Sequence, residues 1–501
     1  MDKKDMRMGE EKLSSPSMNQ STVAECGDEF TLPDYYPEIK RVVSTLCRVL
    51  PESWYDSGDS VEQGGVVAFT VLYLGDDGSI TAAPLTCDFT AVVQMPKSAD
   101  RTDSVVFAET TAENISCRCA GPRRLNLRAR LRTSVMSDRL TDVCADVTDT
   151  AGEPATAEEK LSVQMLESEV RSMRRCFGRV TGNVSGEMRE RAGTKPIMCD
   201  GEIMINEVTL TDGTVTVKGD ALMWCICFGA DGLYYKAVAR APFEEKMTPD
   251  GIVSGGTARA WGRCAAVSVK DSDDGTLLWD MEYDLECEAA QNVAVKVAED
   301  MYSTLRCGEV QMSECESQSV LKCHSGRISL SGSGSRSGTA TAGDYIMGSY
   351  GKVTCDRLER SGGRLTLTGS AEVKVLICGG GEATEETVRL PVKYECDCPV
   401  DGEGELFWRC DASVTDASAR LDGNSISVTA ELSVSLFAGL RCPVKYVSEL
   451  KLDRSAAEPS EGGVLRIYYP SQGESAWDIT KKYRIPKNAV TEVTEGGVLI
   501  E

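Results

Sequence analysis

Val66-Val-Ala-Phe-Thr-Val-Leu-Tyr-Leu74, followed at once by Gly75-Asp-Asp-Gly78, is the clearest structural pattern in the chain. Its β-branched, aromatic and aliphatic side chains are typical of a short buried strand. The Asp-Gly pair after it predicts a tight turn, and a second strand-like run follows at 79–93. We therefore expect an antiparallel hairpin.

Residues 215–238 and 365–392 repeat this unit, each with two Val/Ile/Thr-rich runs around a glycine turn. The turn glycines are 154 and 150 residues apart: Gly75, Gly229 and Gly379. Further strand pairs flank the hairpins, at 203–214 and 351–363 before them and at 125–131 and 425–436 after them. This regular spacing predicts three copies of one β-rich unit.

The patterns together predict a mostly β chain of three tandem, sandwich-like repeats with a small C-terminal module. Residues 161–177 have helical spacing in a β-rich context, so helix and strand both stay open, and the Gly/Ser-rich run 329–343 can be a loop or an edge strand. The expected divisions are a tail at 1–29, repeats at 30–146, 160–305 and 306–454, a linker at 455–463 and a module at 464–501.

The C-terminal module differs from the repeats. After a predicted strand, Ser475 and Asp478 have the spacing of a helix capping box. The helix then has an apolar face formed by Ala476, Ile479 and Tyr483. Beyond it the sequence predicts a break at Pro486, a short second helix at 487–493 and a strand at 496–500 that pairs with the first.

Composition excludes several classes of function. The chain has 501 residues, 54 Lys and Arg against 78 Asp and Glu, and a formal net charge of −24. This acidity repels phosphates, so nucleic acid is not an expected partner. The N-terminus lacks the apolar core of a signal peptide, and the most apolar stretch, 66–74, is too short to cross a bilayer. We expect a cytoplasmic protein without membrane insertion.

Catalysis finds little support in the sequence. His324 is the single histidine, so Ser-His-Asp, Cys-His and multi-histidine metal sites would all depend on it. It follows Cys323, but its Gly/Ser-rich surroundings supply no second ligand. The 379–381 turn lacks the Lys-Ser/Thr of a phosphate loop, and no carboxylate pair has a diagnostic spacing. We expect no catalytic residue, metal or cofactor, and predict that the protein is not an enzyme.

The 21 cysteines are numerous for a chain without an export signal. Cys-X-Cys occurs three times, where residues i and i+2 of a strand would face the same side: Cys117/Cys119, Cys225/Cys227 and Cys396/Cys398. Buried, reduced core residues are the main interpretation. Metal binding and oxidative cross-linking stay open as alternatives.

The terminal module resembles a LysM domain, a βααβ unit, through Gly473-Glu-Ser-Ala-Trp-Asp-Ile-Thr-Lys-Lys-Tyr483. The region of the family's second helix, which helps to form its glycan groove, is shortened here to 488–494. The resemblance therefore implies protein binding more than sugar binding. The partner- or glycan-binding residues that it implies are Gly473, Ser475, Trp477, Asp478, Ile479, Lys482 and Tyr483.

The repeats resemble the SPOCS domains of spore-coat-associated proteins in endospore-forming bacteria. The likeness rests on the motifs at 32–44, 70–75 and 122–129 of the first copy and on the junction Glu299-Asp-Met-Tyr-Ser-Thr304. The other two copies match mainly in strand pattern. SPOCS repeats followed by LysM imply a non-enzymatic spore coat assembly protein at the forespore surface in the mother-cell cytoplasm. Its LysM module would bind the ATPase of the coat's basement layer.

Two details of the module leave alternatives open. Trp477 can be a packing residue or an exposed contact, and Lys481, Lys482 and Arg484 can be a solvated face or docking contacts. Residues 464–501 hold five basic and five acidic side chains, so a neutral module follows an acidic body and can approach an acidic partner. The alternative function is a peptidoglycan- or glycan-binding protein of the cell wall.

Overall fold

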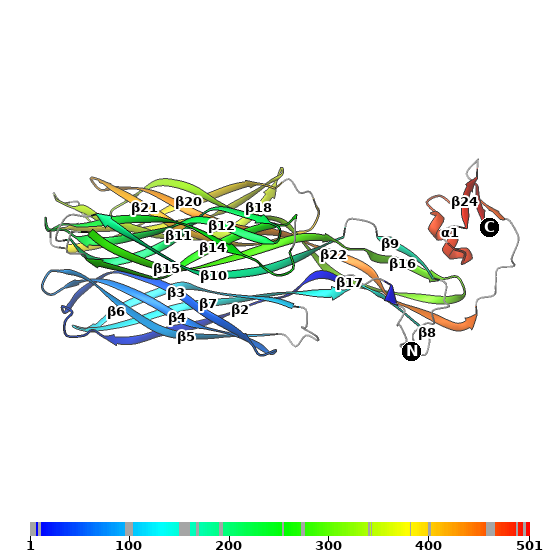
Figure 1. Cartoon of the computed structure of the whole chain (residues 1–501), viewed down its shortest axis with the longest axis horizontal. Helices are drawn as coiled ribbons and strands as arrows, with labels where there is room; N and C mark the ends of the chain where they lie inside the picture. Colours follow the sequence, from blue (N-terminus) through cyan, green and yellow to red (C-terminus); the bar gives the residue numbers. More distant parts are fainter. Residues whose placement is uncertain are drawn as a thin grey trace.

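The computed structural model shows an elongated molecule built almost entirely from β-strands (Figure 1). The structure describes residues 7–8, 12–95, 104–149, 161–166, 170–189, 194–252, 255–271, 276–338, 341, 343–380, 382–398, 402–456, 466–486, 489–493 and 497–500. Within these ranges there is no helix with the length and apolar character needed to span a membrane. The prediction of a mostly β chain is confirmed.

The first part of the chain forms two three-stranded antiparallel sheets, β2-β7-β6 and β3-β4-β5. Their strands are β2 (Lys12–Thr31), β3 (Ile39–Asp56), β4 (Ser60–Gly75), β5 (Ile80–Gln94), β6 (Ser104–Gly121) and β7 (Arg124–Asp142). Alternate residues of β4 point inwards, and Val67, Phe69 and Val71 share one core with Leu125 and Leu127 of β7. Two sheets that each bury one face in this way form a sandwich.

The same strand order occurs twice more, as sheets β10-β15-β14 with β11-β12-β13 and sheets β17-β22-β21 with β18-β19-β20. The second set is β10 (Arg171–Arg189), β11 (Lys195–Thr211), β12 (Thr214–Phe228), β13 (Tyr234–Met247), β14 (Thr257–Asp271) and β15 (Thr276–Ala294). The third is β17 (Arg306–Ser335), β18 (Tyr345–Ser361), β19 (Arg364–Gly379), β20 (Glu382–Asp397), β21 (Glu405–Asp422) and β22 (Ser425–Ala456). The chain therefore contains three sandwiches of one topology.

The hairpin turns lie where the glycine pattern places them. Strands β4 and β5 pair around Gly75–Gly78, in which Gly78 has φ of 80°. Between β11 and β12, Asp212 (φ 48°) and Gly213 (φ 76°) adopt the left-handed conformation that a type I′ turn requires. The hairpins predicted from the sequence are confirmed.

The three sandwiches lie side by side and form one body (Figure 1). Their first strands, β2, β10 and β17, contact one another, so the sandwiches meet along a common line. An apolar cluster shared by all three includes Leu72, Trp224 and Leu376, and the Trp224 ring stacks on Tyr350 at 5.5 Å between centroids. Packing of apolar side chains between the copies makes the body a single unit.

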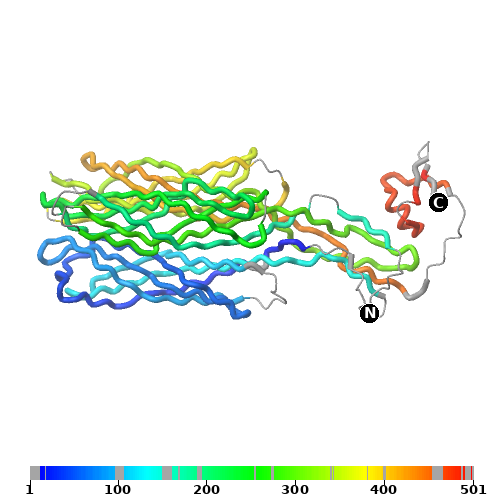
Figure 2. The backbone as a smooth tube through the Cα atoms, in the orientation of Figure 1, coloured from blue at the N-terminus to red at the C-terminus, as the bar shows by residue number. Residues whose placement is uncertain are grey.

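A narrower stalk extends from one end of the body (Figure 2). The far ends of β17 and β22 continue into it and are joined there by β1 (Arg7–Met8), β8 (Ala145–Asp149), β9 (Leu161–Leu166) and β16 (Val297–Ser303). Strand β8 runs parallel to β22, and β16 pairs with β9 in antiparallel fashion. The stalk has its own core, which includes Val147, Met301 and Leu450.

The C-terminal module lies beside the stalk, at the end of the molecule away from the body (Figure 1). It consists of β23 (Arg466–Tyr468), α1 (Ala476–Tyr483), β24 (Val490–Val493) and β25 (Gly497–Ile500). Its sheet has the order β23-β25-β24, so the first strand pairs with the last as predicted. Ile479, Ile485 and Val498 form its core.

Two expectations about secondary structure are wrong. The expected tail at 1–29 is strand from Lys12 onwards, because β2 is the first strand of the first sandwich. Its sequence looks polar because most of its described side chains are exposed, yet Leu13 and Cys26 are buried. The expected second helix at 487–493 is also wrong, because residues 490–493 are β24; residues 487–488 lie outside the described part.

Two open questions are settled by sheet pairing. Within 161–177, residues 161–166 form β9 and residues 171–177 begin β10, so these residues are strand and not helix. In the Gly/Ser-rich run, 329–335 continue β17, an edge strand paired with β22. Most of the expected boundary at 146–159 and of the linker at 455–463 lies outside the described residues.

Candidate functional site

Helix α1 of the C-terminal module begins with a complete capping box. The Ser475 hydroxyl accepts a hydrogen bond from the backbone N–H of Asp478, and the Asp478 carboxylate accepts one from the backbone N–H of Ser475. The hydrogen bonds from the Ser475 hydroxyl and backbone lower the pKa of Asp478. The predicted box is confirmed, and both side chains serve the helix start.

The other predicted site residues divide between the module's interior and its surface. Gly473 has φ of 88° in the turn before the helix, and Ile479 is buried in the core. Tyr483 lies edge-on to Tyr468, with ring centroids 5.6 Å apart. The Lys482 ammonium lies 4.9 Å from the centroid of the Tyr468 ring and donates to its hydroxyl at 2.9 Å. This group therefore stabilises the module itself.

Trp477 has a different role, because its partners belong to the stalk. Its indole N–H donates to the Asp300 carboxylate of β16 at 2.8 Å. The ammonium of Lys481, one turn further along α1, donates to both oxygens of that carboxylate at 2.7 Å. Tyr302 lies edge-on to Trp477 at 5.1 Å between centroids, and its hydroxyl donates to the backbone carbonyl of Ile485 at 2.6 Å.

Of the two interpretations of Trp477, the structure supports the packing residue, because the side chain is only 9% exposed. It packs between the module and the stalk. Sequence reasoning missed Asp300 and Tyr302, although both lie in the junction motif 299–304. Their spacing was the available signal, because residues i and i+2 of a strand face the same side. The sequence does not show which part of the chain lies against these two side chains, because that depends on the tertiary structure.

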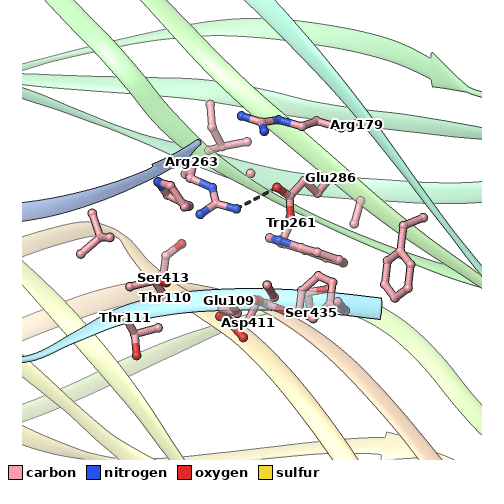
Figure 3. A pocket seen from close by; sticks show the side chains of 18 of the residues that line it. Glu109, Thr110, Thr111, Arg179, Trp261, Arg263, Glu286, Asp411, Ser413 and Ser435 are labelled. Atoms are coloured by element: carbon pink, nitrogen blue, oxygen red, sulfur yellow. Dashed lines mark hydrogen bonds and ion pairs between the residues drawn. The ribbon is translucent and has the colours of Figure 1, made fainter. Parts of the chain in front are cut away.

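A cavity of about 640 Å³ lies between the three sandwiches (Figure 3). Apolar side chains such as Ile203 and Trp261 line it together with carboxylates and arginines. The Arg263 guanidinium donates to Glu286 at 2.9 Å across the lining, so that charge is already paired.

A buried ion cluster adjoins this cavity. The Glu288 carboxylate, 0% exposed, contacts three guanidinium groups: Arg175 at 2.8 Å, Arg259 at 2.7 Å and Arg409 at 2.5 Å. Two further carboxylates pair with the same arginines, Asp138 with Arg175 at 2.5 Å and Asp411 with Arg259 at 2.6 Å. These residues come from all three sandwiches.

The surroundings shift the pKa values of two carboxyl groups in opposite directions. Burial alone would raise the pKa of Glu288, but Arg409, Arg259 and Arg175 lower it to about 2. Burial and the neighbouring Asp411 raise the pKa of Glu109, which lines the cavity, to about 7. The Arg409 guanidinium also lies 4.2 Å from the centroid of the Phe107 ring, a cation–π contact. The cluster therefore joins the sandwiches through fixed charges.

The single histidine and the thiols lie apart from the module. His324 stacks on Tyr394 at 6.0 Å between centroids, and burial lowers its pKa. All 21 cysteines are free thiols, and Cys225 and Cys227 are both buried in the second core, on one face of β12 as expected. The described residues contain no cluster of three or more His, Cys, Asp or Glu side chains arranged to hold a metal ion.

Comparison with known protein families, with curated proteins and with solved structures finds no match to this chain.

Proposed function

We propose that the protein is a non-enzymatic assembly protein of the spore coat, with SPOCS-type repeats and a LysM-type module. This arrangement resembles that of SipL, a spore coat morphogenetic protein. In this proposal the acidic β body is the scaffold, and the module binds the ATPase of the coat's basement layer. The protein would act in the mother-cell cytoplasm, at the forespore surface.

The observation that carries the proposal is the position of the module. A body of three sandwiches, joined by the ion cluster at Glu288, extends through a stalk that holds the small module at its end. Such a shape separates a rigid scaffold from a binding unit. The contact of Trp477 with Tyr302 favours protein over glycan as the natural neighbour of the indole ring.

A fluorescent fusion imaged in sporulating cells tests the proposal, with a variant that lacks residues 464–501 beside it. We expect the full chain to form a ring around the forespore and the truncated chain to be diffuse. A diffuse signal from both would contradict the proposal. Strong retention of the full chain on purified cell wall, abolished by Trp477→Ala, would favour the glycan-binding alternative instead.

A further inference from the structure

The contact between the module and β16 joins surfaces that are each complete without it. The module has its own core around Ile479, and Met301 of β16 points into the core of the stalk. Asp300 and Tyr302 point the other way, towards α1. The contact is therefore an interface between two folded units, formed by residues far apart in the sequence.

The chemistry of this interface is specific. One carboxylate accepts hydrogen bonds from an indole N–H and from an ammonium, which together fix its position. Two residues further along the same strand, a phenol packs on the indole ring and donates to the carbonyl of Ile485. A site of this kind reads an acidic residue and an aromatic residue at positions i and i+2 of an extended segment.

We infer that the face of the module formed by Trp477, Lys481 and the Ile485 carbonyl is a binding site for an acidic-X-aromatic strand, and that β16 of the same chain occupies it. A partner protein that uses this face must present a similar segment and displace β16. The inference rests on the proposed function in one respect, since it deepens the account of how the module binds its partner.

Because β16 occupies the binding face of the module, the apparent affinity of this face for a strand from another molecule is lower. The apparent dissociation constant rises by the inverse of the fraction of molecules in which the face is open. The Lys481 side chain is 42% exposed, so the ion pair at the edge of the interface is accessible to solvent and can open without unfolding the body.

The first test uses a fluorescently labelled peptide with the sequence of residues 297–303 and the full-length chain. Asp300→Lys places a cation against Lys481 and opens the face. The peptide should then bind about tenfold more tightly than to the unaltered chain, as expected if the face is open in about one molecule in ten. Adding Trp477→Ala should abolish this binding.

Matched controls separate the site from a general charge effect. Glu299→Lys makes the same change of charge on the preceding residue, which is exposed and accepts a hydrogen bond from Gln164 of β9. It should leave peptide binding as weak as in the unaltered chain. A peptide with Asp300→Asn should bind poorly to every chain. Tyr302→Phe, which removes only the hydroxyl, should give a smaller gain than Asp300→Lys.

Equal binding of the peptide to the unaltered chain and to Asp300→Lys would overturn occupancy by β16. No binding to Asp300→Lys would overturn the recognition of this strand. A second titration uses the purified basement-layer ATPase, which should also bind Asp300→Lys more tightly. Equal affinity for both chains would mean that the partner uses another surface and would overturn the displacement step. No binding of the ATPase to either chain would contradict the proposed function and leave the peptide result to decide the inference.

Discussion

The ion cluster at Glu288 and the contact at Asp300 both join parts of the chain through a carboxylate, basic side chains and aromatic rings. They differ in depth. Glu288 is 0% exposed and meets three arginines, whereas the ammonium that meets Asp300 belongs to a side chain that is 42% exposed. The loss of one partner from a buried cluster leaves an uncompensated charge. In a partly exposed pair, such as Lys481 with Asp300 at 42% and 24% exposed, water can replace the lost partner.

This difference assigns separate roles to the two contacts. The cluster at Glu288 gathers side chains from all three sandwiches and holds them as one body. The contact at Asp300 holds the module in one position at the end of the stalk. Similar chemistry thus gives a permanent junction at one site and a releasable junction at the other.

The largest effect is expected at the buried cluster. Glu288→Gln removes the negative charge from beneath three arginines and should lower the free energy of unfolding by about 3–5 kcal/mol. Urea denaturation of the purified chain measures this change. Glu207→Gln, which breaks an exposed pair with Lys218, serves as the control and should cost less than about 1 kcal/mol. If both variants lost the same free energy of unfolding, burial would not distinguish the Glu288 cluster from an exposed ion pair.

A change of intermediate size is expected at Glu109. Its pKa is about 7 in the folded chain against an ordinary value of 4.5, so between these values the unfolded chain loses the proton first and stability falls as pH rises. Glu109→Gln removes this loss of stability, so its effect on the free energy of unfolding should be more favourable at pH 8 than at pH 4, by about 3 kcal/mol. The charged groups that act on Glu109 are Asp411, Arg409, Arg259 and Arg263.

Thermal melting at the two pH values tests this prediction. Glu62→Gln changes an exposed carboxyl on strand β4, in the other sheet of the first sandwich, and is the control. Because this side chain is exposed to solvent, the substitution should change the melting temperature little. A gain from Glu109→Gln that does not depend on pH would show that the carboxyl titrates normally.

The smallest effect is expected at the exposed edge of the module contact. Lys481→Gln removes the ion pair with Asp300 but keeps the indole N–H donor, so it should weaken docking by less than about 1 kcal/mol. Hydrogen exchange in α1 should rise slightly. In the unaltered chain, raising the salt concentration from about 0.1 M to about 1 M should screen the ion pair and raise exchange in α1 as the substitution does. In the variant, the same rise in salt should change the exchange little. Strong salt dependence in the variant would point to other charges.

The features that could be predicted are those that depend on residues close together in the sequence. The turn at Gly75–Gly78 and the capping box at Ser475 follow from short-range preferences, and both are present. Strand β2 has a weak apolar pattern, because most of its described side chains are exposed, and the sequence alone does not reveal it. The partners of Asp300 and Glu288 could not be predicted. From the sequence alone a charged residue is expected at the solvent-exposed surface, and only the tertiary structure shows which residues pair with it.

Hydrogen exchange measured along the full chain, before and after Asp300→Lys, tests most directly whether a rigid body carries a releasable module. We expect faster exchange in α1 and β16 of the variant, with no change in β10 and β15, the strands around Glu288. Glu299→Lys should leave all four unchanged. Unaltered exchange in α1, or faster exchange that spreads into the body, would contradict this expectation.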